Sequence, residues 1–161
     1  MRKSSFYQVS HISQANPFDK QMQQLLEDSL KELNFEYYPS ATCVTIEGPR
    51  FSTIAESKLY QSWNCQIVNM TTCPEAQLAA ELGLVYSALG LITDYDVWHD
   101  NKDESVCVEL VNERLKDLTV KTKQVIGLTI KKMGQVDWSK IVAEKEKEAK
   151  MAIMCPNKLE A

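Results

Sequence analysis

Two carboxylates separated by a single residue, Asp94 and Asp96, follow an apolar run at residues 85–92. Ligands of open α/β sheets bind outside the carboxyl ends of the strands, so acids placed there are candidates for chemistry. Residues i and i+2 of a continued strand point to one side, and both carboxylates would then face one ligand. Burial and mutual repulsion push the pKa values of two such acids apart, which suits a heterocycle with a ring nitrogen and an amino group. The alternative is that both acids cap the following turn.

Two further segments carry residue types that bind ligands, and each also has a purely structural explanation. Residues 67–72 precede a predicted helix start, where backbone N–H groups and threonine hydroxyls bind anions. The alternative there is N-capping by Thr72. In residues 47–52, Gly48 permits close approach of the backbone, and Phe51 can stack on a planar ligand. The alternative for this segment is a strand-to-helix turn with Phe51 in the core.

The surrounding sequence predicts the elements that position these segments. Asn16 and Pro17 are typical of a helix N-terminus, and apolar residues at helical spacing continue the helix to about residue 33. Continuous apolar character at 85–93 predicts a central strand covered on both faces. A capping-box pattern at Thr72 and a C′ glycine at Gly83 bound a middle helix. The other predicted elements are strands at 41–47 and 66–70, a short helix capped by Ser52 or Thr53 with Ile54, Ala55 and Leu59 on its apolar face, a polar loop at 99–104, a long helix at 106–133 and a last helix ending near 154.

Strands that alternate with helices predict an α/β fold with right-handed crossovers. The chain has 161 residues, the size of one domain with its own hydrophobic core. We expect one partial domain over 1–161, with an irregular lead segment at 1–15, a sheet-and-helix core at 16–133 and a C-terminal helical segment at 134–161. Only three or four strands are predicted, fewer than a three-layer domain usually contains.

Composition argues against several classes of function. A net charge of −4 provides no basic surface for nucleic acid or an anionic membrane, and no apolar run is long enough to span a bilayer. The five cysteines are scattered without a C-x-x-C pair, which indicates reduced thiols in a cytosolic protein. Two distant histidines do not suit a zinc site. The N-terminus lacks the apolar core of a signal peptide.

Taken together, the motifs resemble the S-methyl-5′-thioadenosine phosphorylases, a branch of the purine nucleoside phosphorylase family. The matching segments are VTIEGPRFST at 44–53, QIVNMTTCPEAQLA at 66–79 and TDYDVW at 93–98, with HISQANPF at 11–18 and DWSK at 137–140. The resemblance extends from about residue 5 to residue 155 and corresponds to the C-terminal half of those enzymes. It implies a partial three-layer αβα sandwich of the nucleoside phosphorylase type. TDYD resembles the 6-aminopurine branch, because 6-oxopurine enzymes carry asparagine at the first aspartate.

The resemblance implies phosphorolysis of methylthioadenosine to adenine and 5-methylthioribose 1-phosphate, a pentosyltransferase reaction of purine and methionine salvage. It assigns Asp94 to the proton at purine N7 and Asp96 to the 6-amino group. Protonation of the leaving base relieves negative charge as the glycosidic bond breaks, which agrees with general acid catalysis. The other implied contacts are Phe51 stacking near the base, Ser52 at a position tied to base selectivity, Tyr95 in the substrate site, Met70 at the ribose, Thr71 at the phosphate, and Val108 and Val111, or Cys107 by one residue of register, at the methylthio group.

His11 resembles a histidine that reaches the methylthio pocket of a neighbouring subunit, which implies a homotrimer or association with full-length subunits. The implied ligands are a purine nucleoside and phosphate, which is a co-substrate. The resemblance implies no cofactor, no metal, no nucleic acid and no membrane partner. It implies a cytoplasmic protein, with the nucleus as a second location.

The N-terminal half of the family has no counterpart in this sequence, including its glycine-rich phosphate turn, its Arg-His pair and its Thr-Ala phosphate contact. Phosphate must lie in line with the ribosyl carbon and stabilise a cationic transition state, which Thr71 alone does not achieve. Two functions stay open: an incomplete form of an active enzyme, and a non-catalytic module that binds or modulates full-length subunits. An incomplete sheet also predicts an unpaired apolar edge and low stability.

Overall fold

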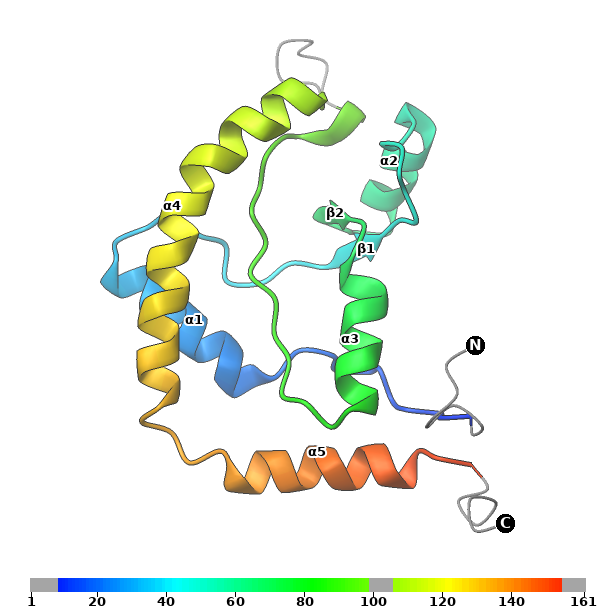
Figure 1. Ribbon diagram of the computed structural model, residues 1–161. Helices are drawn as coiled ribbons and strands as arrows, with labels where there is room; N and C mark the ends of the chain where they lie inside the picture. The colour runs from blue at the N-terminus through cyan, green and yellow to red at the C-terminus, as the bar shows by residue number, and fades with distance from the viewer. Residues whose placement is uncertain (1–8, 99–105, 155–161) are drawn as a thin grey trace.

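The structure is a computed structural model that describes residues 9–98 and 106–154 (Figure 1). The loop expected at 99–104 and the outer parts of the lead and C-terminal segments lie outside the described residues. The mixed order of helices and strands confirms the predicted α/β class. In chain order the elements are α1 (Lys20–Glu32), β1 (Cys43–Thr45), α2 (Ile54–Ser62), β2 (Ile67–Asn69), α3 (Thr72–Glu81), the short 3₁₀ helix η2 (Asp96–Trp98), α4 (Val108–Met133) and α5 (Ser139–Met151).

β1 and β2 pair in parallel, with Cys43 opposite Ile67 and Thr45 opposite Asn69. The predictions at 41–47 and 66–70 placed both strands correctly but made them too long. A parallel pair needs a crossover connection, and α2 provides it. Because the carboxyl ends of parallel strands meet at one edge, the segments that follow β1 and β2 leave the sheet side by side. These are the two segments that carry candidate ligand-binding residues.

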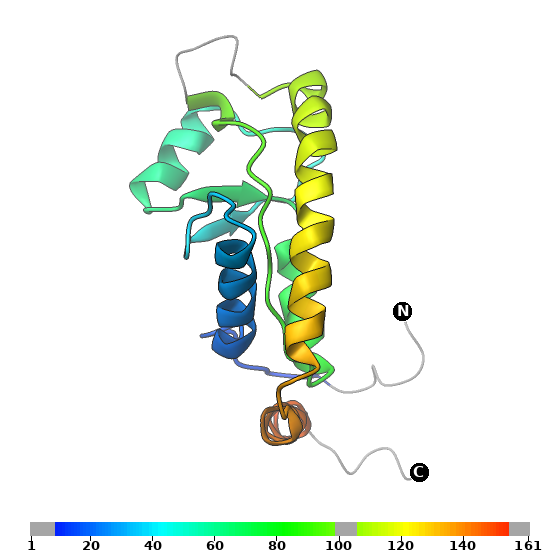
Figure 2. The same ribbon diagram turned by 90° about the vertical axis from the view of Figure 1, so that its left-hand side faces the viewer.

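The strand predicted at 85–93 is wrong, because within the described chain this segment is extended but joins no sheet. Figures 1 and 2 both show it running beside α4. The Tyr86 carbonyl accepts a hydrogen bond from Asp19 N at 2.7 Å, and the Thr93 carbonyl accepts one from Arg114 Nη1 at 2.8 Å. The apolar pattern indicated an extended backbone correctly. It did not indicate pairing, which depends on neighbouring strands that the described chain does not provide.

The main packing contact joins α1 to α4. At its centre Val125 is 2% exposed and Ser29 is fully buried. The Ser29 hydroxyl donates to Leu25 O at 2.7 Å, and Thr129 Oγ1 lies 3.0 Å from Ser29 Oγ and 2.8 Å from Val125 O. The hydroxyls of Ser29 and Thr129 in this contact therefore both have partners, as buried polar groups require.

We expect Val125→Ala to lower the free energy of unfolding by about 2 kcal/mol, because it removes two buried carbons and leaves a cavity. The matched control is Val120→Ala on the same helix, where the side chain is 61% exposed. That change should stay within about 0.5 kcal/mol of wild type. Urea unfolding followed by far-ultraviolet circular dichroism measures both. Equal losses from the two variants would contradict the α1–α4 core.

Two helices differ from their predicted form. α1 begins later than predicted: Asp19 is its N-cap and accepts from Met22 N at 2.9 Å, whereas Asn16 and Pro17 precede the helix. α2 buries Ser57, whereas the predicted apolar face is exposed. Aspartate is as good an N-cap residue as asparagine. The sequence therefore has two possible N-caps for α1, and the apolar periodicity does not distinguish between them. The exposed residues of the predicted α2 face are Ile54, Ala55 and Leu59.

The remaining helices follow the predicted bounds closely. α4 ends at the C-cap Gly134, and Gly83 after α3 has φ +68° as expected of a C′ glycine. α5 lies below the lower end of α4 and runs at a steep angle to it (Figures 1 and 2). Its end returns to the lead segment, where Ser10 and Ile153 form an antiparallel bridge.

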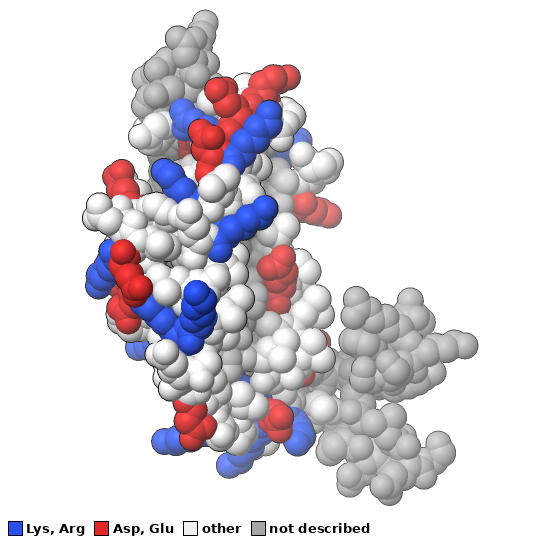
Figure 3. Space-filling view, turned by 60° about the vertical axis from the view of Figure 1, so that its left-hand side comes forward, with Lys and Arg blue, Asp and Glu red and all other residues white. Residues whose placement is uncertain are grey.

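Charged side chains of both signs are mixed over the face shown in Figure 3, and neither sign forms a continuous patch there. Within residues 9–98 and 106–154, no helix has the length and apolar character of a membrane span. The same described residues contain no group of three or more His, Cys, Asp or Glu side chains arranged to hold a metal ion.

Candidate functional site

Asp94 lies in a tight loop directly after the extended segment. Its Oδ2 accepts from the Thr93 hydroxyl at 2.6 Å, and its Oδ1 accepts from the backbone N–H of Asp96 at 2.8 Å. The second bond forms an Asx turn, so the capping alternative is realised for Asp94. These two bonds fix the orientation of the carboxylate. A carboxylate has about four acceptor positions, so both oxygens retain capacity for a ligand.

Asp96 was expected to continue a strand. In the structure it begins η2 instead, with φ +58°. Aspartate tolerates this left-handed conformation better than most residues. The two carboxylates are therefore not related by strand alternation. The Asp96 Oδ2 atom is buried and has no hydrogen-bond partner within the described chain. A buried acceptor without a partner is costly, and it marks a position that suits a donor such as an amino group.

Ser52 is another buried group without a partner: it is 7% exposed, and its hydroxyl makes no hydrogen bond in the described chain. It precedes α2, and α2 packs against η2. The unpartnered atom of Asp96 thus lies in η2, and that of Ser52 lies two residues before the helix that packs against η2. Phe51 is 39% exposed, so the alternative that placed it in the core is wrong.

The start of α2 is held by a capping box between Thr53 and Glu56. The Thr53 hydroxyl accepts from Glu56 N at 3.2 Å, and Glu56 Oε2 accepts from Thr53 N at 2.8 Å. Arg50 adds two hydrogen bonds to the same carboxylate at 2.7 and 2.8 Å. The cap fixes the backbone immediately after Phe51 and Ser52.

Stability should depend on pH through this cap. The hydrogen bonds from Arg50 first, and then those from Thr53, hold the pKa of Glu56 well below its ordinary 4.5. A carboxyl with a lowered folded pKa stabilises the fold above its unfolded pKa, and that contribution is lost as pH falls through the folded pKa. We expect the urea concentration at the midpoint of unfolding to decrease as the pH is lowered below about 5. Glu56→Gln should remove part of this pH dependence. Glu36→Gln, at an exposed position outside the cap, is the control; an equal change in both variants would contradict this role.

Gly48 follows β1 and Met70 follows β2, and these two residues lie against each other. Gly48 has φ +71°, and a Cβ atom at this position would lie 2.8 Å from Met70 Sδ. The close approach that the glycine permits is therefore to the Met70 side chain. Met70 can take its half-buried position because Gly48 has no Cβ atom.

We expect Gly48→Ala to lower the free energy of unfolding by about 1–2 kcal/mol and to displace Met70, because alanine is strained at positive φ. Gly127→Ala is the matched control, since nothing lies within 4 Å of a Cβ built at this helical position. Alanine there should raise the stability by about 0.5–1 kcal/mol. Urea unfolding distinguishes the opposite signs, and a neutral Gly48→Ala would contradict the strained turn.

Thr71 is the N-cap residue of α3, but its hydroxyl makes no capping bond and is bonded to nothing else in the described chain. The predicted capping by Thr72 is wrong. Its hydroxyl instead receives a hydrogen bond from Asn69 Nδ2, while Asn69 Oδ1 accepts from the Thr45 hydroxyl at 2.9 Å. Asn69 therefore ties both strands to α3 and leaves the exposed Thr71 outside the network. The sequence argument missed this role of Asn69 and Thr45.

The first turn of α4 carries the residues implied at the methylthio group. Val108 is exposed and Val111 is half-buried, and a spacing of three places them on adjacent positions of one face. Cys107, the alternative in register, is the N-cap, and its sulfur accepts from Leu110 N at 3.4 Å. The side chain of Cys107 is thus already used in holding the helix start.

Arg114 is a functional candidate that the sequence argument missed. Its guanidinium comes from α4 and donates to the Thr93 carbonyl, directly before Asp94. Arg114 follows Val111 by three residues, so the two lie on one face of α4. The only signal in the sequence was this spacing, which does not distinguish a loop-holding arginine from a solvated one.

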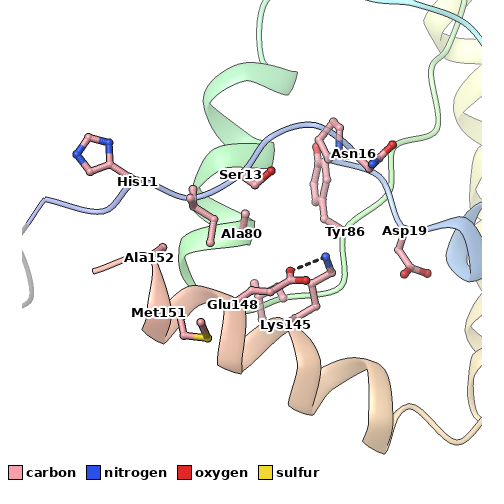
Figure 4. A pocket seen from close by; sticks show the side chains of 13 residues that line it. His11, Ser13, Asn16, Asp19, Ala80, Tyr86, Lys145, Glu148, Met151 and Ala152 are labelled. Carbon is pink, nitrogen blue, oxygen red and sulfur yellow. Dashed lines mark hydrogen bonds and ion pairs between the residues drawn. The ribbon is translucent and has the colours of Figure 1, made fainter. Parts of the chain in front are cut away.

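His11 is not brought together with the other candidates in this chain. Its backbone N–H donates to Ala152 O at 2.9 Å, and its exposed side chain borders a cavity of about 360 Å³ between the lead segment, α3 and α5 (Figure 4). Lys145 and Glu148 pair at 3.0 Å on the α5 side of this cavity. A second cavity of about 450 Å³ lies between β1 and α2. Neither cavity contains Asp94 or Asp96.

The family model described as Phosphorylase superfamily matches residues 1–130, so the chain belongs to the phosphorylase superfamily. It is similar to the S-methyl-5′-thioadenosine phosphorylases of Danio rerio (35% identity, 92% of this chain and 52% of the relative) and Aedes aegypti (39%, 92% and 53%). The methylthioadenosine phosphorylase of Schistosoma mansoni in complex with adenine superimposes with a TM-score of 0.90 at 28% identity, over 96% of this chain and 59% of that chain.

A mutant of the Schistosoma mansoni adenosine/methylthioadenosine phosphorylase in complex with methylthioadenosine gives a TM-score of 0.86 at 28% identity, over 94% of this chain and 57% of that chain. The fold is therefore that of part of a nucleoside phosphorylase, as the motifs implied. The chain spans about half the length of the Danio rerio and Aedes aegypti relatives.

Proposed function

We propose that this chain carries the purine-binding side of an S-methyl-5′-thioadenosine phosphorylase, which converts methylthioadenosine and phosphate to adenine and 5-methylthioribose 1-phosphate. The observation that carries the proposal is the unpartnered buried Asp96 Oδ2 atom, whose backbone N–H orients the Asp94 carboxyl, together with the unpartnered Ser52 Oγ atom just before the helix that packs against η2. Similar proteins of known structure contain adenine and methylthioadenosine, which supports this substrate class.

In this proposal, Asp96 Oδ2 accepts a hydrogen bond from the 6-amino group of the purine, which supplies the missing partner. Asp94 delivers a proton to N7, so that adenine leaves as a neutral base. The exposed ring of Phe51 stacks on the base, Ser52 contributes to base selectivity and Tyr95 borders the substrate. The Thr93 and Asp96 contacts to Asp94 orient its carboxyl for this transfer.

The proposed ribose and phosphate contacts come from the β2–α3 turn and the start of α4. Met70 contacts the ribose, Thr71 donates its unengaged hydroxyl to phosphate, and Val108 and Val111 line the methylthio group. Phosphate is a co-substrate, and no cofactor takes part. His11 would contact the methylthio pocket of a neighbouring subunit in a homotrimer. The proposed setting is salvage of purine and methionine in the cytoplasm, and also in the nucleus.

Calorimetry with adenine and an adenine-release assay with methylthioadenosine and phosphate test the proposal. We expect adenine to bind the purified chain and hypoxanthine to bind more weakly, because the 6-amino group of adenine donates a hydrogen bond to Asp96 and the 6-oxygen of hypoxanthine has no proton to donate. Adenine release tests whether Thr71 suffices for phosphate. Absence of adenine binding by both the chain and its complexes with superfamily members would overturn the proposal.

A non-catalytic module that binds or modulates full-length phosphorylase subunits is the second candidate. The observation in its favour is the number of large apolar side chains left exposed in the described chain, including Trp63 at 60% and Leu82 at 70%. This function predicts co-purification with a full-length relative and a change in that relative's turnover. If no association occurs at micromolar concentration, this candidate is excluded.

A further inference from the structure

Arg114 is a charged residue on the inward face of α4. That face is formed largely by apolar side chains at helical spacing, and it leads from Val111 through Leu118 to the buried Val125. A half-buried guanidinium at such a position loses solvation that an apolar side chain does not need. Its hydrogen-bond partner in the described chain is the Thr93 carbonyl at 2.8 Å. The contact across to the extended segment therefore explains this arginine better than packing along the helix does.

Thr93 connects Arg114 to Asp94. Its carbonyl accepts from Arg114 Nη1, and its hydroxyl donates to Asp94 Oδ2 at 2.6 Å. The other carboxylate oxygen of Asp94 accepts from Asp96 N at 2.8 Å. The Thr93 carbonyl belongs to the planar peptide group that joins Thr93 to Asp94. By holding that group, Arg114 sets the direction in which the Asp94 side chain leaves the backbone.

The same stretch of α4 carries the residues proposed at the methylthio group. Val111 precedes Arg114 by three residues, which is about 4.5 Å along a helix axis. The cap of this first turn is weak, because it is a 3.4 Å contact from Leu110 N to the sulfur of Cys107, and sulfur is a poor acceptor. A ligand group packed on Val108 and Val111 therefore has order to contribute to the turn, and a differential contact of this kind can shift a conformational equilibrium.

We propose that Arg114 makes proton delivery by Asp94 depend on the 5′ substituent of the nucleoside. A methylthio group packed on Val108 and Val111 orders the first turn of α4. The ordered turn holds Arg114 on the Thr93 carbonyl, and Thr93 in turn holds the Asp94 carboxyl. Arg114 is thus a positioning residue that acts through Thr93. The inference rests on the proposed function and deepens it, because a part of the substrate that does not react then raises kcat as well as affinity.

Turnover of methylthioadenosine and of 5′-deoxyadenosine, which lacks the methylthio group, tests this dependence. We expect the wild-type kcat to be at least about tenfold higher for methylthioadenosine. Arg114→Met should bring the two kcat values to within about twofold, while the ratio of the KM values stays, because Val108 and Val111 are unchanged. Arg114→Lys should restore most of the kcat difference, since an ammonium group can donate to the same carbonyl. Lys116→Met, which removes a charge at an exposed position of α4, is the matched control and should behave as wild type does.

Hydrogen exchange at the Asp96 amide provides a second readout, which needs nucleoside binding but no turnover. This amide donates to Asp94, so its exchange reports on the orientation of the carboxyl. In the saturated wild type, it should exchange at least about tenfold more slowly with methylthioadenosine than with 5′-deoxyadenosine. In Arg114→Met the two nucleosides should protect it equally. A merely structural role of Arg114 would lower the protection by both nucleosides and leave the difference between them in place.

The two readouts separate this inference from the proposed function. Equal protection of the Asp96 amide by both nucleosides in wild type, or a difference that survives in Arg114→Met, would overturn the inference and leave the proposed function standing. If the nucleosides bind without turnover, exchange at Asp96 alone decides. Absence of binding by both nucleosides would contradict the proposed function, and the inference with it.

Discussion

Replacement of Asp94 by asparagine should lower the rate of adenine release from methylthioadenosine by about 10²–10⁴-fold, the usual contribution of a general acid. The amide has no proton to deliver at neutral pH, so adenine must leave with greater negative charge. Asparagine still offers an oxygen to Asp96 N, so the Asx turn is retained and the fold changes little. The measurement is adenine release by the active form of the protein.

The matched control is Asp117→Asn, which removes the same charge at an exposed position on α4. It should leave adenine release within about twofold of wild type, since exposed charges at a distance act weakly. Unchanged adenine release in Asp94→Asn would remove Asp94 from the proposed mechanism.

Asp96→Asn should weaken adenine binding about 10- to 100-fold, because a hydrogen bond to a charged group in a buried site contributes about 1.5–3 kcal/mol. Asparagine is tolerated in the left-handed conformation that Asp96 adopts, so the backbone of the loop stays in place. The loss then reports on the carboxylate and not on the turn. Calorimetry with adenine measures it directly.

Asp96→Gly distinguishes the effect of losing the side chain from an effect on the backbone, since glycine adopts the same positive φ without strain. It should lose adenine affinity to a similar degree as Asp96→Asn. Hypoxanthine, which presents an oxygen at position 6, should bind Asp96→Asn at least as well as it binds wild type. Adenine affinity that survives in both variants would show that the unpartnered Oδ2 atom is not a purine contact.

Helix positions were predictable where a strong local signal acts alone. The bounds of α4 were predicted closely, and Gly83 located the end of α3, because a glycine at C′ is a strong local signal for the end of a helix. Starts were less predictable: Asn16 and Asp19 are both good caps, and only packing selects Asp19. The apolar run at 85–93 specified an extended backbone, but pairing is a property of neighbouring strands and has no local signature.

In the candidate site, too, residues in local motifs were predictable and residues whose role depends on distant segments were not. The motifs led to Phe51, Met70, Thr71 and Asp94 without any structure, because these residues stand in segments that resemble the motifs of the family. The conformation of Asp96 was not predictable, since a left-handed aspartate has no distinctive neighbours in sequence. Arg114 and Asn69 were missed because their roles arise only when distant segments meet.

The bridge between Ser10 and Ile153 has a consequence for the order in which the protein folds. It joins residues separated by almost the whole described chain, and closing so long a loop costs entropy that only an already assembled structure offsets. Nearer contacts, such as the β1–β2 pair, close much shorter loops. We therefore expect the bridge to form late, so that the position of His11 is acquired only after the helices and the parallel strand pair are in place.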